Sequence, residues 1–392
     1  MRNETPKRNN ITLLIFEHKI FRMKKLYLVL VLLYLYGSLL LYADKIKVVD
    51  LNDKTPVSGV SVLSSSGLIL GFTDEAGELS IKIGDLPLSL RSIGYETVTI
   101  NDSQDTIFLK PAVYTLSDIE IKPDDRPITR VITYAREYCT GATPSDTLQM
   151  YNEYMLEYFF AEGKVKGYDK SDARPYSRNE RRYGRIANSS GLDSVMRPKY
   201  NDDIASLSFL SNMAFVPFDI REETEVLKNG AQSDTILGKY YPKFIYFKND
   251  NFFTVDCDAL SDHKEHKWSP WFFKMFGMTM EMQQADWSIL FNKNDEGKYG
   301  IYDFIFGTYN LKVIGKGKML KKMIGVKDTI DIYCYIEQYP VEIERLTIEK
   351  YKDLKEDYFS RKEDFKEPSN LQPLPETIEK LVKRIDSEIL KK

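Results

Sequence analysis

Apolar and polar residues alternate in short runs over residues 44–122, with turn-forming residues between the runs. Leu79, Ile81 and Ile83 show the alternation clearly, and Asp74 and Gly77 are residue types that favour tight turns. Several short strands at such close spacing are typical of an all-β sandwich. Residues 44–122 are therefore predicted to form one small β-sandwich domain.

The pattern changes after the sandwich. Residues 122–127 contain two prolines among charged residues, which is typical of a linker. Helical spacing then follows at Ile128, Val131, Ile132, Ala135 and Tyr138. Residues 123–140 are accordingly predicted to be a linker followed by a helix of about twelve residues.

From residue 141 to 366, strand patterns dominate. Alternating apolar and polar positions predict strands at 151–160, 240–247, 251–257, 288–292, 299–306, 311–320, 329–337 and 341–350. One polar face along many of them indicates a large antiparallel sheet, curved or partly closed. Residues 367–392 then carry a Pro-rich start and an amphipathic helix with the stripe Ile378, Leu381, Val382, Ile385 and Ile389. The predicted fold class is mainly β, with an α+β second domain and a C-terminal helix.

The first 43 residues contain the pattern of an export signal. Lys24 and Lys25 precede the apolar run 26–41, and Ala43 offers a small residue for cleavage, as in a secretory signal peptide. We therefore interpret Met23 as the site where translation starts, and residues 1–22 as a stretch added by placing the start too far upstream. The alternative is an uncleaved N-terminal membrane anchor, but a spanning helix needs about 20 apolar residues and this run is shorter. The residue directly after Ala43 is not Cys, which argues against a lipoprotein anchor.

Charge and cysteine content narrow the class of protein. The chain has 55 basic and 58 acidic residues, and residues 1–43 contain seven of the basic and two of the acidic ones. The mature chain therefore has 48 basic and 56 acidic residues, a net charge of −8. Such a balance argues against nucleic acid as a partner.

Cys139, Cys257 and Cys334 have apolar or aromatic neighbours, which favours buried free thiols. One disulfide with one thiol left over is the alternative in an oxidising compartment.

Three segments carry a resemblance to a known family. PVSGVSV at 56–62, TDEAGEL at 73–79 and SIGYE at 92–96 resemble the carboxypeptidase regulatory-like domain. That resemblance implies a transthyretin-like sandwich of about seven strands and an accessory, usually non-catalytic module of Gram-negative envelope proteins. It covers residues 44–122, while the remainder resembles, more loosely, regions of uncharacterised envelope proteins. The implied location is the periplasm or the outer membrane.

Two metal-binding hypotheses arise from a polar segment and its neighbour. His263 and His266 are three residues apart, which converges on one face only if the segment is helical. The spacing is not that of a zinc protease motif, and the segment is more typical of a solvated loop. Together with Met278 and Met280, the histidines would offer a soft copper(I) site. We favour the loop and expect no cofactor.

Residues 268–282 are unusually rich in tryptophan, phenylalanine and methionine. Burial under a sheet is the favoured interpretation, since aromatic segments are mostly buried. The alternative is an exposed patch in which Trp268, Trp271 and Phe272 dock on a membrane or protein, or stack on a sugar.

A basic run follows the first long strand of the second domain. Arg174, Arg178 and Arg182, with Arg181 and Arg185, have near-helical spacing and would bind an anionic glycan or lipid head group. The favoured alternative is a solvated face paired with acidic residues.

The sequence lacks the common catalytic motifs. It has no nucleophile elbow, no Ser-x-x-Lys followed by Lys-Thr-Gly, and no phosphate loop. We therefore expect a non-catalytic envelope protein that binds or scaffolds an envelope protein or glycan. One alternative is a peptide or glycan hydrolase with catalysis in residues 141–366, because paired carboxylates are placed by the fold and not by spacing. The other is a membrane- or partner-docking protein that uses residues 268–282.

Overall fold

The computed structural model describes residues 44–81, 85–112, 125–142, 146–161, 163–173, 176–188, 193–196, 233–237, 242–247, 252–258, 275, 277–292, 301–318, 329–357, 364–369 and 371–389. Among these residues, no helix is long and apolar enough to cross a membrane. The predicted signal peptide lies outside the described residues.

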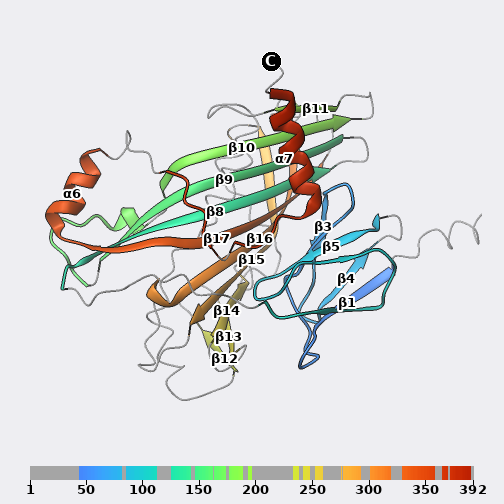
Figure 1. Ribbon diagram of the computed structural model, residues 1–392, viewed down its shortest axis with the longest axis horizontal. Coiled ribbons are helices and arrows are strands. Elements are labelled where there is room, and N and C mark those ends of the chain that lie inside the picture. Colours follow the sequence, from blue (N-terminus) through green and yellow to red (C-terminus); the bar gives the residue numbers. More distant parts are fainter. Residues whose placement is uncertain are drawn as a thin grey trace, which may run out of the picture.

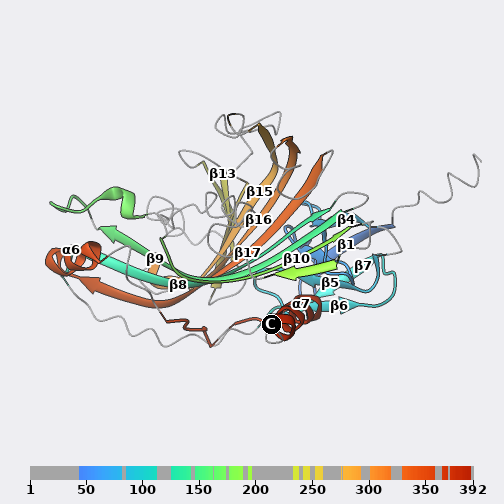
Figure 2. The same cartoon turned by 90° about the horizontal axis from the view of Figure 1, so that it is seen from above.

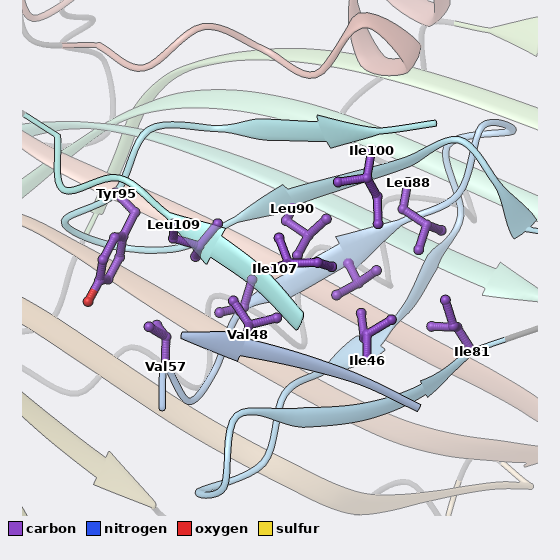
Figure 3. Close-up of a cluster of buried hydrophobic side chains, with 12 residues drawn as sticks. Ile46, Val48, Val57, Ile81, Leu88, Leu90, Tyr95, Ile100, Ile107 and Leu109 are labelled. Carbon is purple, nitrogen blue, oxygen red and sulfur yellow. The ribbon is translucent and has the colours of Figure 1, made fainter. Parts of the chain in front are cut away.

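Residues 44–112 form a β-sandwich, as predicted. Its strands are β1 (Asp44–Asp50), β2 (Ser61–Leu63), β3 (Ile69–Phe72), β4 (Glu78–Ile81), β5 (Leu88–Arg91), β6 (Val98–Ile100) and β7 (Thr106–Leu109). One sheet has the order β4-β1-β7 and the other β3-β2-β5-β6. Ile46 and Val48 of the first sheet pack against Leu88 and Leu90 of the second, in a core that is almost fully buried (Figure 3). Burial of this apolar surface holds the two sheets together.

The predicted turn at residues 73–77 is present. Asp74 Oδ1 accepts hydrogen bonds from the backbone N–H groups of Ala76 and Glu78, both at 2.9 Å. Gly77 has φ +72°, and a Cβ there would collide with the carbonyl oxygen of Val48. The turn therefore requires glycine at this position.

Ten described strands beyond the sandwich form one antiparallel sheet. They are β8 (Ile128–Ala142), β9 (Asp146–Ala161), β10 (Tyr176–Asn188), β11 (Asp193–Met196), β12 (Ser233–Leu237), β13 (Pro242–Phe247), β14 (Phe252–Asp258), β15 (Met278–Asn292), β16 (Phe304–Gly317) and β17 (Ile330–Leu346). Their order is β11-β10-β9-β8-β17-β16-β15-β14-β13-β12. The predicted large antiparallel sheet is confirmed, and its long strands are visibly curved (Figures 1 and 2).

The helix predicted after the linker is wrong, because Ile128–Ala142 is the central strand β8. β8 pairs with β9 on one side and with β17 on the other along its whole length. Side chains alternate along a strand, so Val131 and Ala135 point to one face of β8 and Ile132 and Tyr134 to the other. All four are buried, so both faces of β8 are covered. A strand buried on both faces has no polar alternation, and its apolar residues can match helical spacing by chance.

Two pairs of predicted strands are single long strands. The segments 299–306 and 311–320 overlap β16, and 329–337 and 341–350 overlap β17. β17 continues past Pro340 because its register with β8 shifts between Pro340 and Glu342. Such a bulge accommodates a residue that has no N–H to donate. Residues after β17 form the helix α6 (Ile348–Glu356) instead of a strand.

The predicted C-terminal helix is confirmed as α7 (Glu376–Ile389). Ile378, Leu381 and Ile385 are buried against Leu63 of the sandwich and Tyr138 of the large sheet. Figure 1 shows α7 beside both the long strands and the sandwich. The C-terminal segment therefore covers the junction between the two β units.

Candidate functional site at the junction of the sandwich and the sheet

The sandwich is hydrogen-bonded directly to one face of the large sheet. The backbone N–H of Ile69 donates to Thr140 Oγ1 at 3.1 Å. Asn310 Nδ2 donates to the carbonyl oxygen of Gly59 at 2.9 Å. The Tyr138 hydroxyl donates to the carbonyl oxygen of Gly67. These contacts come from β8 and β16, so the sandwich spans several strands of the sheet.

A buried cluster of three charges lies in the same junction. β17 places Glu337 directly opposite Arg136 of β8, and β5 of the sandwich contributes Arg91. Arg136 Nε lies 2.6 Å from Glu337 Oε2, and Arg91 Nη2 lies 2.9 Å from the same oxygen. Arg91 Nε also donates to Glu337 Oε1. Since the three side chains are at most 4% exposed, we name Arg91, Arg136 and Glu337 the junction triad.

Two tyrosines complete the shell around Glu337. The Tyr335 hydroxyl donates to Oε1 at 2.9 Å and the Tyr339 hydroxyl donates to Oε2 at 3.1 Å. Both lie two residues from Glu337 on β17, so strand alternation points all three side chains to the same face. Burial and the Glu337 charge raise the pKa of Tyr335, which therefore remains a protonated donor.

The electrostatics of the triad favour an ionised carboxylate. Burial acts to raise the pKa of Glu337, but the charges and hydrogen bonds of Arg136 and Arg91 outweigh burial and lower this pKa to about 2. Two cations face one anion, so one positive charge is in excess. Arg91 Nη1 donates to the carbonyl oxygen of Pro373 at 2.5 Å, and Arg136 Nη2 donates to that of Gln372. The backbone leading into α7 thus accepts one hydrogen bond from each arginine, through a nitrogen that does not contact Glu337.

The junction leaves little free space. A cavity of about 20 Å³, lined by Arg91, Arg136, Glu337 and Tyr151 among others, lies between the sandwich, the sheet and α7. That volume holds about one water molecule. The triad therefore has its polar groups committed to the protein itself, and its geometry suits a structural joint.

The histidine and tryptophan candidates cannot be placed. His263, His266, Trp268, Trp271 and Phe272 lie outside the described residues. Of the methionines proposed with them, Met280 is buried in β15, whereas Met278 begins β15 opposite Gly317 and its side chain is not described.

The arginine run lies on the strand β10 and not on a helix. Arg181 pairs in register with Glu153, and Arg182 pairs with Asn152. The side chains of Arg178 and Arg182 are not described. Arg181 Nη1 lies 3.4 Å from Glu153 Oε2, and Arg185 Nε lies 2.8 Å from Asp193 Oδ1. Arg178 lies at a register shift of β10, and Arg174 lies outside the described residues. The two arginines whose side chains are described, Arg181 and Arg185, are thus each paired with an acidic residue.

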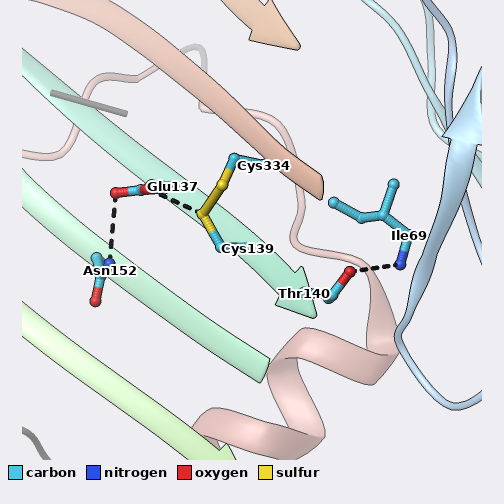
Figure 4. Close-up of a disulfide and its surroundings, with 6 residues drawn as sticks. All are labelled: Ile69, Glu137, Cys139, Thr140, Asn152 and Cys334. Carbon is cyan, nitrogen blue, oxygen red and sulfur yellow. Dashed lines mark hydrogen bonds between the residues drawn. A yellow bond between two sulfur atoms is a disulfide. The ribbon is translucent and has the colours of Figure 1, made fainter. Parts of the chain in front are cut away.

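The expectation of three free thiols is wrong for two cysteines. Cys139 of β8 and Cys334 of β17 are direct cross-strand partners and form a disulfide (Figure 4). Their side chains point to the face opposite the triad. Glu137 lies on the same face, with Oε1 3.0 Å from Cys139 Sγ, and Asn152 Nδ2 lies 3.4 Å from Glu137 Oε2. Cys257 lies on β14, and its side chain is not described.

The sequence does not predict the triad, and it offers the disulfide only as an alternative without assigned partners. Arg91 and Glu337 are 246 residues apart, and Cys139 and Cys334 are 195 apart. The usable signal was charge within apolar strands, since Glu337 follows a run of aromatic and aliphatic residues in which a lone acid needs a partner.

No protein-family model matches this chain, and no curated protein matches it significantly.

Proposed function

We propose that this chain is an exported, non-catalytic envelope protein that binds or scaffolds an envelope protein or glycan. In this proposal the sandwich is an accessory module of the carboxypeptidase regulatory-like kind, fixed to the large sheet by the junction triad. The observation that carries it is the saturation of Glu337, whose two oxygens accept hydrogen bonds from Arg91, Arg136, Tyr335 and Tyr339.

A catalytic acid or base needs access to substrate and a pKa near the working pH. Glu337 has neither, because it is buried and the neighbouring cations hold its pKa at about 2. The adjacent cavity accommodates about one water molecule and no substrate. The junction therefore supports a joint that fixes two units in one orientation, as a scaffold requires.

The disulfide supports the location. Disulfides persist in oxidising compartments such as the periplasm and are rare in the cytosol. The bond between Cys139 and Cys334 agrees with the signal peptide expected at residues 23–43.

We expect the purified protein to hydrolyse none of a panel of peptides, esters and glycans. The reason is that the buried carboxylate at the junction is sealed from solvent. Turnover that survives repurification and disappears when one histidine, or one carboxylate other than Glu344, in residues 141–366 is neutralised would establish the hydrolase alternative. The matched control is Glu344→Gln, which changes a partly exposed acid of the same strand β17.

Docking through residues 268–282 remains a second candidate because of Met275. This side chain is 73% exposed, whereas Met280 in the same segment is 2% exposed. We expect the wild type to co-sediment with liposomes or envelope fractions, and Met275→Ser and a Trp271→Ala, Phe272→Ala variant to partition less. Unchanged partitioning, accompanied by loss of folding in the double variant, would place the aromatic residues in the core.

A further inference from the structure

We propose that Glu137, Cys139 and Cys334 bind one Zn²⁺ ion when the disulfide is reduced. The site lies on the face of the sheet opposite the junction triad and is independent of the proposed scaffold function. It uses two thiolates and one carboxylate, a donor set that zinc accepts.

The strands place the three donors side by side on one face of the sheet. Cys139 and Cys334 are directly opposite one another on β8 and β17, and Glu137 is two residues before Cys139 on the same face. One donor atom from each residue lies within 4.8 Å of the other two, and all three residues are buried. Continuous pairing of β8 with both β9 and β17 fixes these positions.

The donor set discriminates among metals. The two sulfurs argue against Mg²⁺ and Ca²⁺, which prefer oxygen ligands alone; thiolates suit both zinc and copper(I), and the carboxylate favours zinc. Zn²⁺ accepts mixed sulfur and oxygen ligands in a tetrahedron with Zn–S bonds of about 2.3 Å. Asn152 provides a supporting contact, because its Nδ2 lies 3.4 Å from Glu137 Oε2. A water molecule would fill the fourth position of the tetrahedron.

Zinc and the disulfide exclude each other. Two sulfurs on one tetrahedral zinc lie about 3.8 Å apart, which a covalent S–S bond forbids. A dithiol opens the site by giving two electrons and two protons and becoming a disulfide itself; a phosphine gives the two electrons, takes an oxygen from water to become the phosphine oxide, and water supplies the two protons, so two thiols form in either case. Binding Zn²⁺ then releases both thiol protons as the thiolates coordinate the ion. Exchange with a small-molecule disulfide, which accepts two electrons from the thiolates and leaves as two thiols, re-forms the bond and expels the metal.

The test compares zinc uptake by oxidised and reduced protein. We expect wild type treated with a phosphine reductant to retain one equivalent of Zn²⁺ after gel filtration, and the oxidised protein to retain none. Co²⁺ in place of zinc should give a sulfur-to-cobalt charge-transfer band and tetrahedral d–d bands. Glu137→Gln should weaken Zn²⁺ binding at least tenfold, and Cys139→Ser and Cys334→Ser should abolish the retained equivalent.

The matched control is Cys257→Ser, which removes a thiol but leaves the trio intact and should bind like wild type. Zn²⁺ should also raise the midpoint of thermal unfolding of reduced wild type, and leave that of Cys139→Ser unchanged. If reduction alone unfolds the chain, refolding with Zn²⁺ and without oxidant replaces the titration. Equal retention by Cys139→Ser, equal affinity in Glu137→Gln, or loss of binding in Cys257→Ser would overturn the assignment.

Discussion

Replacing Glu337 with alanine is expected to lower the free energy of unfolding by about 3–5 kcal/mol, because a buried ion pair that loses one partner leaves an uncompensated charge. Here two cations lose their shared anion, since Arg91 and Arg136 both pair with Glu337. Urea denaturation followed by circular dichroism measures the change. Glu344→Ala on the same strand is the control, and its partly exposed side chain should cost at most about 1 kcal/mol. Arg130 keeps its buried partner Glu157 in that control.

Arg91→Met should destabilise less than Glu337→Ala. Removing Arg91 leaves the balanced pair Arg136 and Glu337 on adjacent strands and replaces a buried charge with an apolar side chain. Equal losses in the two variants would contradict the view that excess positive charge is the main cost of removing Glu337.

Acid titration separates the ionic contribution from packing. The pKa of Glu337 is about 2 in the folded protein and 4.5 as its ordinary value. A depressed folded-state pKa contributes stability that is present above pH 4.5 and is lost as the pH falls toward 2. The difference in unfolding free energy between wild type and Glu337→Gln should therefore shrink over this window. A difference that stays constant from pH 5 to pH 2 would show that the carboxylate charge contributes nothing.

The second large effect concerns the disulfide. Replacing both Cys139 and Cys334 with alanine should lower the free energy of unfolding by about 2–5 kcal/mol, because the bond closes a long loop in the unfolded chain. The bond joins residues 195 positions apart, at the centre of the large sheet. Thermal and urea denaturation of the double variant measure the loss, with Cys257→Ala as the control for removing a thiol. A double variant as stable as wild type would mean that the link is absent in solution.

The sequence predicts well those elements that have a polar face. The alternation around Leu79 and Ile81 gave the sandwich, and the stripe containing Ile378, Leu381 and Ile385 gave α7. These elements show one apolar face, so periodicity identifies them. The prediction for β8 was wrong because this strand is buried on both faces. The apolar positions Ile128, Val131 and Ala135 then fit a helix as well as a strand.

The site was less predictable than the fold. Arg91, Arg136 and Glu337 meet only because β8 and β17, far apart in the chain, become neighbours in the sheet and the sandwich docks on their face. No spacing rule encodes such a meeting, since it depends on strand order and register. The same holds for the trio Glu137, Cys139 and Cys334, of which only the first two are close in sequence.

The central claim is that the junction triad joins the sandwich and the sheet into one cooperative unit. Differential scanning calorimetry of wild type and Glu337→Ala tests it most directly, because independent units unfold in separate transitions. We expect one transition for wild type, with equal calorimetric and van't Hoff enthalpies, and two resolved transitions for Glu337→Ala. Two transitions in wild type, or a single unshifted transition in the variant, would contradict the claim.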